Sequence, residues 1–489
     1  MNARLDGPTA RRWVTLALTA LASARPRIDA LNVFPVADAD TGTNVVLTLS
    51  AGARSAQDLP EDASLGDLSR ALADGALWGA RGNSGVILAQ ALQALARTFE
   101  GLDSAGPSDL IRAFDAIAQG AHRALAAPVE GTIVTVARDV AGATLALSPH
   151  ATLVDVVTAA VQAGNASLDT TTDTLPVLRG TAMVDAGALA FTILVEALAA
   201  ALGLAPSVHP DWLAAAPDEP HEHDRLEGFE VMYLVRASHR QATALRMHLS
   251  AIGNSVVVVQ GAQELWHVHV HLEHPAQALS ELPMSQVCVR PLDPPKRRVG
   301  IVAVTTAPQL LESLARAGAV AVLAADAATI ARAVVDAGAG DVLVLPCSAA
   351  AAAEAATASG DAVVVADGYA VAVGPTLDDL AVYESVALLE AATESGVPEL
   401  LAVVRDLVSA RTHVVGNADP RSLEAEVHAL ARELASGVPA VVTVLVGAAV
   451  GARRAAKLLT ALLEAASPEL ETFIVVGGQP ETALLVRVQ

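Results

Sequence analysis

Apolar positions along residues 1–204 recur at helical spacing, three to four residues apart, in successive blocks. Clusters of Gly, Pro and Asp separate these blocks at Gly101–Ser108, Pro128–Gly131 and Leu175–Pro176. The pattern predicts an all-helical first domain. The stretch from 205 to 228 then carries four prolines among Asp, Glu and His residues. Such a composition cannot bury enough apolar surface to fold alone, so we interpret this stretch as a linker.

After the linker, the hydrophobic pattern changes to short alternating runs. These runs predict strands at Phe229–Val235, Ser255–Gln260, Leu265–His271 and Ser285–Arg290, and helical patterns lie at His239–Ala251 and Pro275–Glu281. The resulting order is βαββαβ. It predicts a ferredoxin-like middle domain over residues 229–293, with a four-stranded sheet that carries both helices on one face.

The remainder, residues 294–489, alternates short aliphatic runs with Ala-rich helical stretches, as a parallel α/β domain requires. The predicted strands lie at Arg298–Val304, Val320–Ala324, Asp341–Pro346, Asp361–Ala366, Ala440–Val446 and Thr472–Gly477. The fold class predicted for the whole chain is therefore multidomain, with an α part followed by α/β parts.

Composition narrows the classes of function. The chain has 489 residues, 53% of them hydrophobic, yet no run reaches the roughly 20 apolar residues that a membrane span needs. Its net charge of -22 argues against a surface that binds nucleic acid, and its aromatic content of 3% is too low for a stacking platform. Two cysteines and no signal sequence at the amino terminus indicate a cytoplasmic protein without disulfides.

The most informative segment lies between the first two helical blocks. Asp38 and Asp40 stand near Asn32, directly before a helix that the pattern predicts to open at Val45. Paired carboxylates suit Mg²⁺, which is commonly shared with phosphate oxygens, and the backbone N–H groups of a helix start can bind those phosphates. The small or capping residues Thr41, Gly42, Thr43 and Asn44 would let a phosphate approach closely. The alternative is an Asx-turn with a helix cap.

Three further segments hold polar residues at predicted helix starts. The turn Gly79–Gly85 contains Gly82, Asn83 and Ser84, and it could wrap N–H groups around phosphate although it lacks the lysine of a P-loop. Thr132 and Asp185 each precede another helix. Taken singly, each segment is more often a helix cap than a site.

Together and in this order, the four segments resemble the helical domain of the fatty acid kinase ATP-binding subunit, which is related to the L subunit of dihydroxyacetone kinases. The family's first loop reads N-V-F-P-V-P-D-G-D-T-G-T-N, and this chain departs from it at Ala37 and Ala39. If the family glycine sits at positive φ, Ala39 should strain the loop by roughly 1 kcal/mol.

The resemblance implies an antiparallel barrel of helices whose loops clasp ATP. It implies that Asn32, Asp38 and Asp40 hold the Mg²⁺ ions, with Asp38 and Asp40 as catalytic residues. The same resemblance places the nucleotide against Thr41, Gly42, Thr43, Asn44, Gly82, Asn83, Ser84, Thr132 and Asp185.

The third strand of the middle domain, Leu265–Leu272, alternates apolar residues with His267, His269 and His271. In a ferredoxin-like order the first strand lies beside the third, so Glu230 can neighbour these histidines. Imidazole and carboxylate suit Zn²⁺. The family has a metal site on the same strand pair, with cysteine where this chain has Glu230. The alternative is a polar sheet face with surface histidines.

The family resemblance also implies the activity: transfer of the ATP γ-phosphate to a fatty acid carboxylate, which a separate fatty-acid-binding protein of the DegV type presents. The ending Gly477-Gly478-Gln479-Pro480 matches the family's terminal turn and implies a DegV-like carboxy-terminal domain. Aliphatic surface on that domain and on the open sheet face suggests a homodimer. Two alternatives stay open: a dihydroxyacetone-kinase-like enzyme for small molecules, and a regulatory or scaffold protein with weakened catalysis.

Overall fold

The structure is a computed structural model of the chain. It describes residues 4–34, 39–125, 128–181, 183–205, 228–261, 264–361, 368–408, 412–416, 420–434, 441–449, 451–467 and 470–488. The chain divides into two compact units. The first contains Met1–Leu226 and Val235–Val270, and the second contains Glu227–Leu234 and His271–Gln489.

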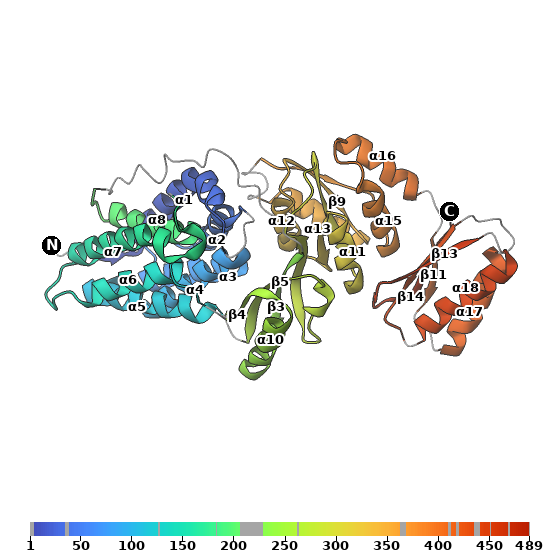
Figure 1. Cartoon of the computed structure of the whole chain (residues 1–489), viewed down its shortest axis with the longest axis horizontal. Helices are drawn as coiled ribbons and strands as arrows, with labels where there is room; N and C mark the ends of the chain where they lie inside the picture. The colour runs from blue at the N-terminus through green and yellow to red at the C-terminus, as the bar shows by residue number, and fades with distance from the viewer. Residues whose placement is uncertain are drawn as a thin grey trace. The chain divides into compact units, whose positions relative to one another are not determined.

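Eight helices make up most of the first unit, at the blue and green end of Figure 1. They are α1 (Gly7–Ala30), α2 (Thr41–Gln57), α3 (Leu65–Trp78), α4 (Gly82–Thr98), α5 (Pro107–Ala124), α6 (Ile133–Leu145), α7 (Leu153–Thr174) and α8 (Ala186–Ala201). The helical spacing read from the sequence is confirmed. Short strands β1 (Leu5–Asp6) and β2 (Ser104–Ala105) pair beside them.

Each of these helices packs against the next one along the chain, and α8 packs against α1. Their shared core is built mainly from Ala, Leu and Val side chains, as the low aromatic content requires. Small residues let the helices approach closely, since a Cβ on Gly52 of α2 would lie 2.5 Å from the carbonyl oxygen of Leu72 in α3. No described helix has the length and hydropathy to cross a membrane.

The middle part contains β3 (Phe229–Arg236), α10 (His239–Ile252), β4 (Asn254–Gln260), β5 (Leu265–Leu272) and β6 (Met284–Pro291). All four strands and the first helix agree with the sequence prediction. The strand order β6-β3-β5-β4 places the first strand beside the third, as expected for a ferredoxin-like domain.

The second predicted helix of the middle domain is wrong. Only one 3₁₀ turn forms, at Pro275–Gln277. The Ser280 hydroxyl accepts a hydrogen bond from the Leu282 amide and so fixes a local turn, and such side-chain bonds compete with helix. Pro283, which directly follows that turn, cannot donate the backbone bond that a continuing helix needs.

The second unit holds a parallel α/β part. Its strands are β7 (Val299–Thr305), β8 (Val320–Leu323), β9 (Asp341–Leu345) and β10 (Ala370–Val373), and its helices are α11 (Leu311–Arg316), α12 (Ala327–Asp336), α13 (Ala349–Ser359), α15 (Asp379–Leu389) and α16 (Val397–Val408). The strands run in the order β10-β9-β7-β8, and β6 pairs antiparallel with β8. Three predicted strands are confirmed. The fourth, Asp361–Ala366, falls mostly outside the described residues.

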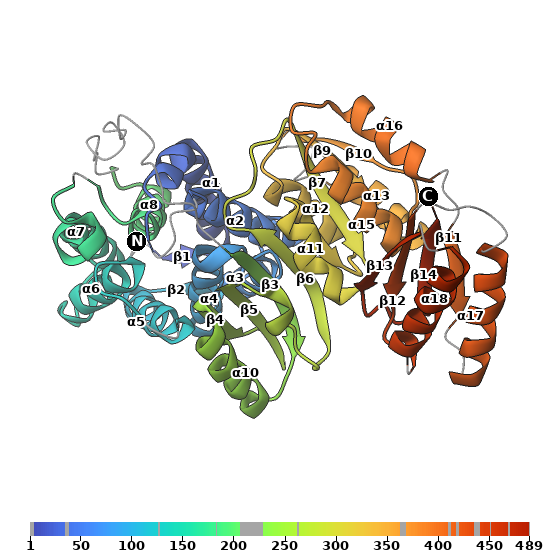
Figure 2. The same ribbon diagram turned by 45° about the vertical axis from the view of Figure 1, so that its right-hand side comes forward.

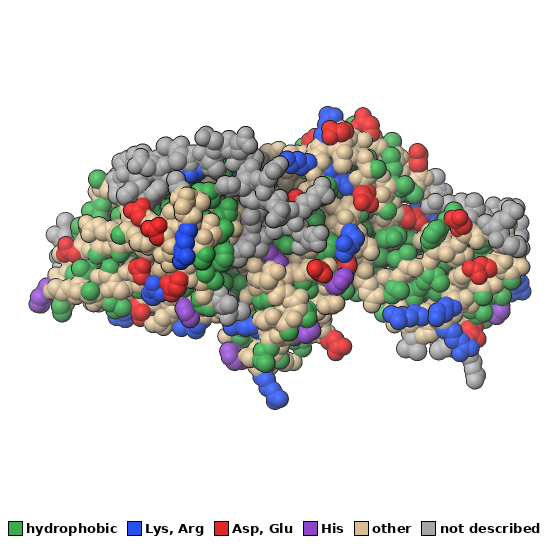
Figure 3. All heavy atoms as spheres, viewed as in Figure 1, with side chains coloured by type: hydrophobic (Ala, Val, Ile, Leu, Met, Phe, Trp, Pro, Cys, Tyr) green, Lys and Arg blue, Asp and Glu red, His purple; other side chains and the backbone are tan. Residues whose placement is uncertain are grey.

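The chain ends in a separate four-stranded sheet. It contains β11 (Thr412–Gly416), β12 (Val441–Val446), β13 (Glu471–Val476) and β14 (Thr482–Val488), in the order β11-β14-β12-β13. Helices α17 (Pro420–Leu434) and α18 (Ala452–Ala466) lie together on one side of it (Figure 2). Leu423, Leu459 and Val444 belong to the aliphatic core that these elements share. On the face shown in Figure 3, Lys and Arg side chains occur in small scattered groups rather than one field.

Candidate functional site

The first polar loop leads directly into α2. Asp40 is the residue before the helix, and the first helical bond runs from the Asn44 amide to the Asp40 carbonyl oxygen, at 2.8 Å. The helix therefore begins at Thr41 rather than at Val45, and Thr41–Asn44 form its first turn. The Asn44 side-chain amide also donates to the Asp40 carboxylate, at 2.8 Å. Asp38 lies outside the described residues.

Ala39 adopts a φ of +53°, in the left-handed region. Ala39 therefore has the positive φ on which the expected strain depends. Its Cβ makes this backbone conformation unfavourable. Beside it, the Thr41 hydroxyl donates a hydrogen bond to the side-chain oxygen of Asn32, which is buried at the end of α1. Asn32 and Asp40 therefore flank the same helix start.

The second segment meets the first. The hydroxyl oxygens of Thr41 and Ser84 lie 3.2 Å apart, which joins the first turns of α2 and α4. Gly82 opens α4 with a φ of +52°, and a Cβ on it would lie 2.3 Å from the Asn44 side-chain nitrogen. Only glycine fits such a position. The side-chain oxygen of Asn83 is buried without a hydrogen-bond partner within the described part of the chain, as expected where a ligand would supply one.

The sequence interpretation missed Asp29. Its two carboxylate oxygens accept from the Thr43 amide and the Thr43 hydroxyl, each at 2.9 Å, and so hold the first turn of α2 against α1. Burial raises the pKa of Asp29, the bonds from Thr43 oppose that shift, and the charge of Asp40 adds to it. A signal was available in the sequence: Asp29 and Asn32 stand three residues apart at the end of one helical block, which puts them on one face.

The third and fourth segments also meet. Thr132 precedes α6 and donates its hydroxyl to the Val129 carbonyl oxygen, at 2.8 Å. Asp185 caps α8 by accepting from the Ala188 amide, at 2.8 Å, and it accepts from the Ile133 amide at the start of α6 as well. Burial raises the pKa of Asp185 to about 6, against the lowering effect of these amides.

The four segments thus form two joined pairs of helix starts, α2 with α4 and α6 with α8. Helix starts present unpaired N–H groups and a positive dipole end, which bind phosphates. Asn32, Asp40 and Asp29 add oxygen ligands of the type that Mg²⁺ prefers. Phosphate and a divalent cation are therefore the ligands that this donor set fits.

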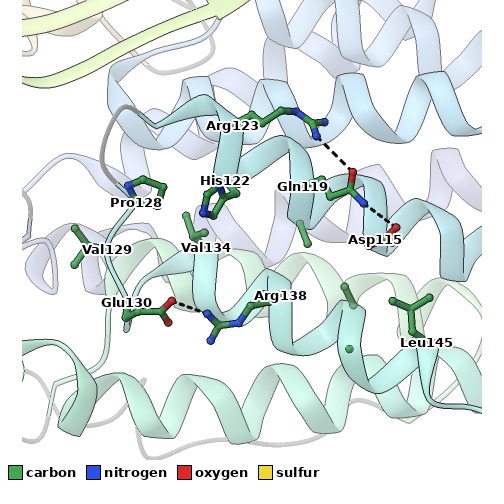
Figure 4. Close-up of a pocket in the computed structure, with 13 residues that line it drawn as sticks. Asp115, Gln119, His122, Arg123, Pro128, Val129, Glu130, Val134, Arg138 and Leu145 are labelled. Atoms are coloured by element: carbon green, nitrogen blue, oxygen red, sulfur yellow. Dashed lines mark hydrogen bonds and ion pairs between the residues drawn. The ribbon is translucent and has the colours of Figure 1, made fainter. Parts of the chain in front are cut away.

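A cavity of about 560 Å³ opens between α5 and α6 (Figure 4). Pro128, Val129 and Glu130, which precede Thr132 in the loop before α6, line it, whereas no residue of the other three polar segments does. Arg138 pairs with Glu130 at 2.6 Å and lowers the pKa of that carboxylate. This cavity therefore borders the start of α6 but none of the other three helix starts.

The candidate metal site in the middle domain is buried. One ligand atom from each of Glu230, His269 and His271 lies within 4.8 Å of the others, and the three residues are 3%, 1% and 2% exposed. The alternative of surface histidines is therefore wrong. His267 is buried too, but it is not part of this group. The Glu230 carboxylate forms an ion pair with Arg290, so a cation that binds here has a competitor for that ligand.

A carboxylate and two imidazoles within bonding reach of one another match the ligands of Zn²⁺ or a similar transition ion. The residues present therefore fit a metal ion, with Glu230, His269 and His271 as its protein ligands.

Family models match two parts of the chain. Residues 35–200 match the family model of the DAK2 domain, and residues 227–284 match the family model of the FakA-like middle domain, which takes its name from fatty acid kinase. The resemblance to the fatty acid kinase ATP-binding subunit family is therefore confirmed. The joined helix starts fall within the DAK2 match, except for Asn32 and Asp29, which precede it.

Curated proteins are similar to about half of this chain. Protein YloV of Bacillus subtilis is 33% identical over 293 residues, which is 56% of this chain and 53% of that protein. An uncharacterized protein of Staphylococcus saprophyticus is 30% identical over 295 residues, or 57% of this chain and 53% of its own length. One from Staphylococcus epidermidis is 31% identical over 268 residues, or 52% and 48%. The matched part spans about half the length of these relatives.

Proposed function

We propose that this chain is the ATP-binding catalytic subunit of a fatty acid kinase. It would transfer the γ-phosphate of ATP to a fatty acid carboxylate and give an acyl phosphate. The observation that carries the proposal is the junction of α2 and α4, where Thr41 contacts both Asn32 and Ser84 next to the Asp40 carboxylate. This junction lies at the start of a matched kinase-family domain.

Asn32, Asp38 and Asp40 would hold Mg²⁺, with Asp29 as a further candidate. Bound there, Mg²⁺ would neutralise charge on the ATP phosphates. The backbone amides of Thr41–Asn44 and Gly82–Ser84 would orient those phosphates, and Thr132 and Asp185 would lie near the nucleotide. The two close-packed helix starts fix these donors before ATP binds, so little reorganisation accompanies transfer.

A base is not required of the protein. Phosphoryl transfer depends mainly on positioning and charge neutralisation, and a carboxylate acceptor is already ionised at pH 7. One carboxylate oxygen would form the new bond to phosphorus while the bond to the ADP oxygen breaks. The protein side chains then need only align the acceptor with the γ-phosphate.

The proposed acceptor is a fatty acid held by a separate protein of the DegV type. On this proposal the helices α1–α8 form the antiparallel barrel of the family, and residues 294–489 form its DegV-like part, which docks the partner. The protein would act in the cytoplasm as a homodimer. Zn²⁺ at Glu230, His269 and His271 would stabilise the middle domain.

A second candidate is a regulatory or scaffold protein with weakened catalysis. The positive φ of Ala39 favours it, because strain in the metal loop reduces the population of the binding conformation. A dihydroxyacetone-kinase-like activity on small hydroxy-ketones is the remaining alternative, and no contact among the described residues favours it specifically.

The test combines binding and turnover. The double variant Asp38→Asn, Asp40→Asn should lose Mg²⁺-dependent ATP binding in calorimetry and lose acyl phosphate formation with the co-purified partner, while its circular dichroism stays unchanged. The matched control is Asp58→Asn, an exposed carboxylate at the other end of α2, which should keep both activities. Unchanged turnover in the double variant would sink the kinase assignment. Binding of ATP by the wild type without any transfer would favour the scaffold.

A further inference from the structure

The parallel sheet of the second unit has a topological switch point. From β7 the chain passes to β8 on one side, and from β9 it passes to β10 on the other, while β7 and β9 are hydrogen-bonded neighbours. In open α/β sheets, ligands bind in the crevice outside the carboxyl ends of two such strands. Thr305 is the last residue of β7, and Thr306 follows it. Cys347 and Ser348 follow β9.

One carboxylate already occupies this position, that of Asp379 in the first turn of α15. The Thr305 hydroxyl donates to its Oδ1 at 2.6 Å, and the Thr306 amide donates to the same oxygen at 2.7 Å. The Thr306 hydroxyl donates to Oδ2 at 2.5 Å. Both oxygens of one carboxylate are thus bound, away from solvent, since Thr305 is 0% and Asp379 is 6% exposed.

The donors are held in place independently of the carboxylate. The Ala307 amide donates to the Thr305 hydroxyl oxygen at 3.0 Å, which leaves the hydroxyl hydrogen to point at Asp379. The helix does not need Asp379 as its cap either, because Asp378 fills that role by accepting from the Ala381 amide at 2.8 Å. The contact of Asp379 with the two threonines is therefore additional to the ordinary capping of α15.

We propose that Thr305 and Thr306 form a carboxylate-binding site, which this chain fills with its own Asp379. Two hydroxyls and one amide, preset at the carboxyl end of a central strand, recognise the group by its two oxygens and its charge. The ligand class is a monocarboxylate, and Asp379 acts as a tethered one. The neighbouring thiol takes no part as a nucleophile, since burial, with Asp379 next in effect, raises the pKa of Cys347 to about 12.

A consequence follows for the acceptor, and it rests on the proposed function. Because the site is filled from within, the second unit cannot hold the carboxylate of a free fatty acid at its switch point. The acceptor carboxylate would have to be held elsewhere than at this switch point.

The experiment opens the site in the full chain. In Asp379→Ala, sodium acetate at pH 7 should raise the thermal unfolding midpoint above that in sodium chloride of equal ionic strength. At ten times its dissociation constant, acetate shifts a folding equilibrium by about elevenfold. The wild type should show no difference between the two salts. Asp326→Ala is the matched control. Asp326 also accepts hydrogen bonds from an amide and a hydroxyl, both of Thr329, but it lies at an exposed helix start.

Adding Thr306→Val to Asp379→Ala should weaken acetate binding about tenfold, because valine keeps the side-chain shape and the backbone amide but lacks the hydroxyl donor. If Asp379→Ala does not fold in chloride, recovery of its helical circular dichroism in acetate supports the proposal. Equal behaviour in both salts, folded or unfolded, overturns it. None of these measurements uses ATP, so failure of the kinase assignment leaves the outcome unaffected.

Discussion

Asp185 gives the sharpest quantitative prediction, because its carboxyl is only 6% exposed and burial raises its pKa from the ordinary 3.8 to about 6. Between those two pH values the folded chain binds more protons than the unfolded chain, so the free energy of unfolding falls as the pH rises. A shift of about two units at 1.36 kcal/mol each corresponds to about 3 kcal/mol. The stabilisation is fully present below pH 3.8 and is lost by the time the pH has passed 6.

Asp185→Asn removes the ionisation and keeps a side-chain oxygen that can accept from the Ala188 amide, since Asn caps helices as well as Asp does. The difference in unfolding free energy between variant and wild type should therefore move in favour of the variant by about 2.4 kcal/mol from pH 4 to pH 7, because part of the roughly 3 kcal/mol is already lost at pH 4. The measurement is urea unfolding followed by the fluorescence of Trp13, which donates to the Leu194 carbonyl oxygen in α8 at 3.0 Å. The other three tryptophans, Trp78, Trp212 and Trp266, are replaced by Phe in every variant.

The control is Asp155→Asn at the start of α7. A backbone hydrogen bond from Thr152 lowers the pKa of Asp155, so the difference from wild type should never move in favour of this variant as the pH rises, and it should be flat above the range in which free carboxylates titrate. If the Asp185→Asn difference is equally flat, burial does not disfavour the charge of Asp185 and the reasoning is refuted.

Three further changes test the loops and the metal site. Ala39→Gly should tighten binding of the Mg²⁺–ATP complex about fivefold by calorimetry, by relieving about 1 kcal/mol of left-handed strain, whereas Ala324→Gly, at a φ of +44° in the second unit, should not alter it. Gly82→Ala should lower the free energy of unfolding by about 1–2 kcal/mol, because the added Cβ would meet Asn44. Gly142→Ala, in α6 with open space around it, should raise the free energy of unfolding by about 0.5–1 kcal/mol. Urea unfolding that ranks the two variants the other way would contradict the argument. Added Zn²⁺ should raise the thermal unfolding midpoint of the metal-free wild type and not that of His271→Ala. The control His274→Ala, which changes an exposed histidine, should respond like wild type. An equal rise in all three proteins would show that Zn²⁺ does not bind at His271.

Elements with a strong local period could be predicted from the sequence. The helices of the first unit and the strands β3 to β9 follow from spacing alone, because the apolar face of each element is written in neighbouring residues. The start of α2 could not be predicted in the same way. Thr41–Asn44 are weak helix formers, and the turn forms because Asp29, from the preceding helix, binds the amide and hydroxyl of Thr43.

The candidate site divides in the same manner. The motif residues Asp40, Gly82 and Ser84 could be selected from composition and order, and the structure brings their segments together. Asp29 was missed because its role depends on a tertiary contact, not on the loop motif. The burial of His269 and His271 was likewise not predictable, since it depends on which segments, distant along the chain, cover that face of the sheet.

Carboxylates lie at the helix starts of the DAK2 match. Such ends normally attract anions, yet here Asp29 lies against the first turn of α2, Asp40 precedes it, and Asp185 binds the starts of α6 and α8. The chain's own carboxylates therefore offset much of the positive dipole before any nucleotide arrives. On the proposed function, free ATP should be a poor ligand and an inhibitor only at high concentration. Loading would then follow the supply of divalent cation, so that changes in free Mg²⁺, rather than in ATP itself, would set how much of the protein is charged with nucleotide.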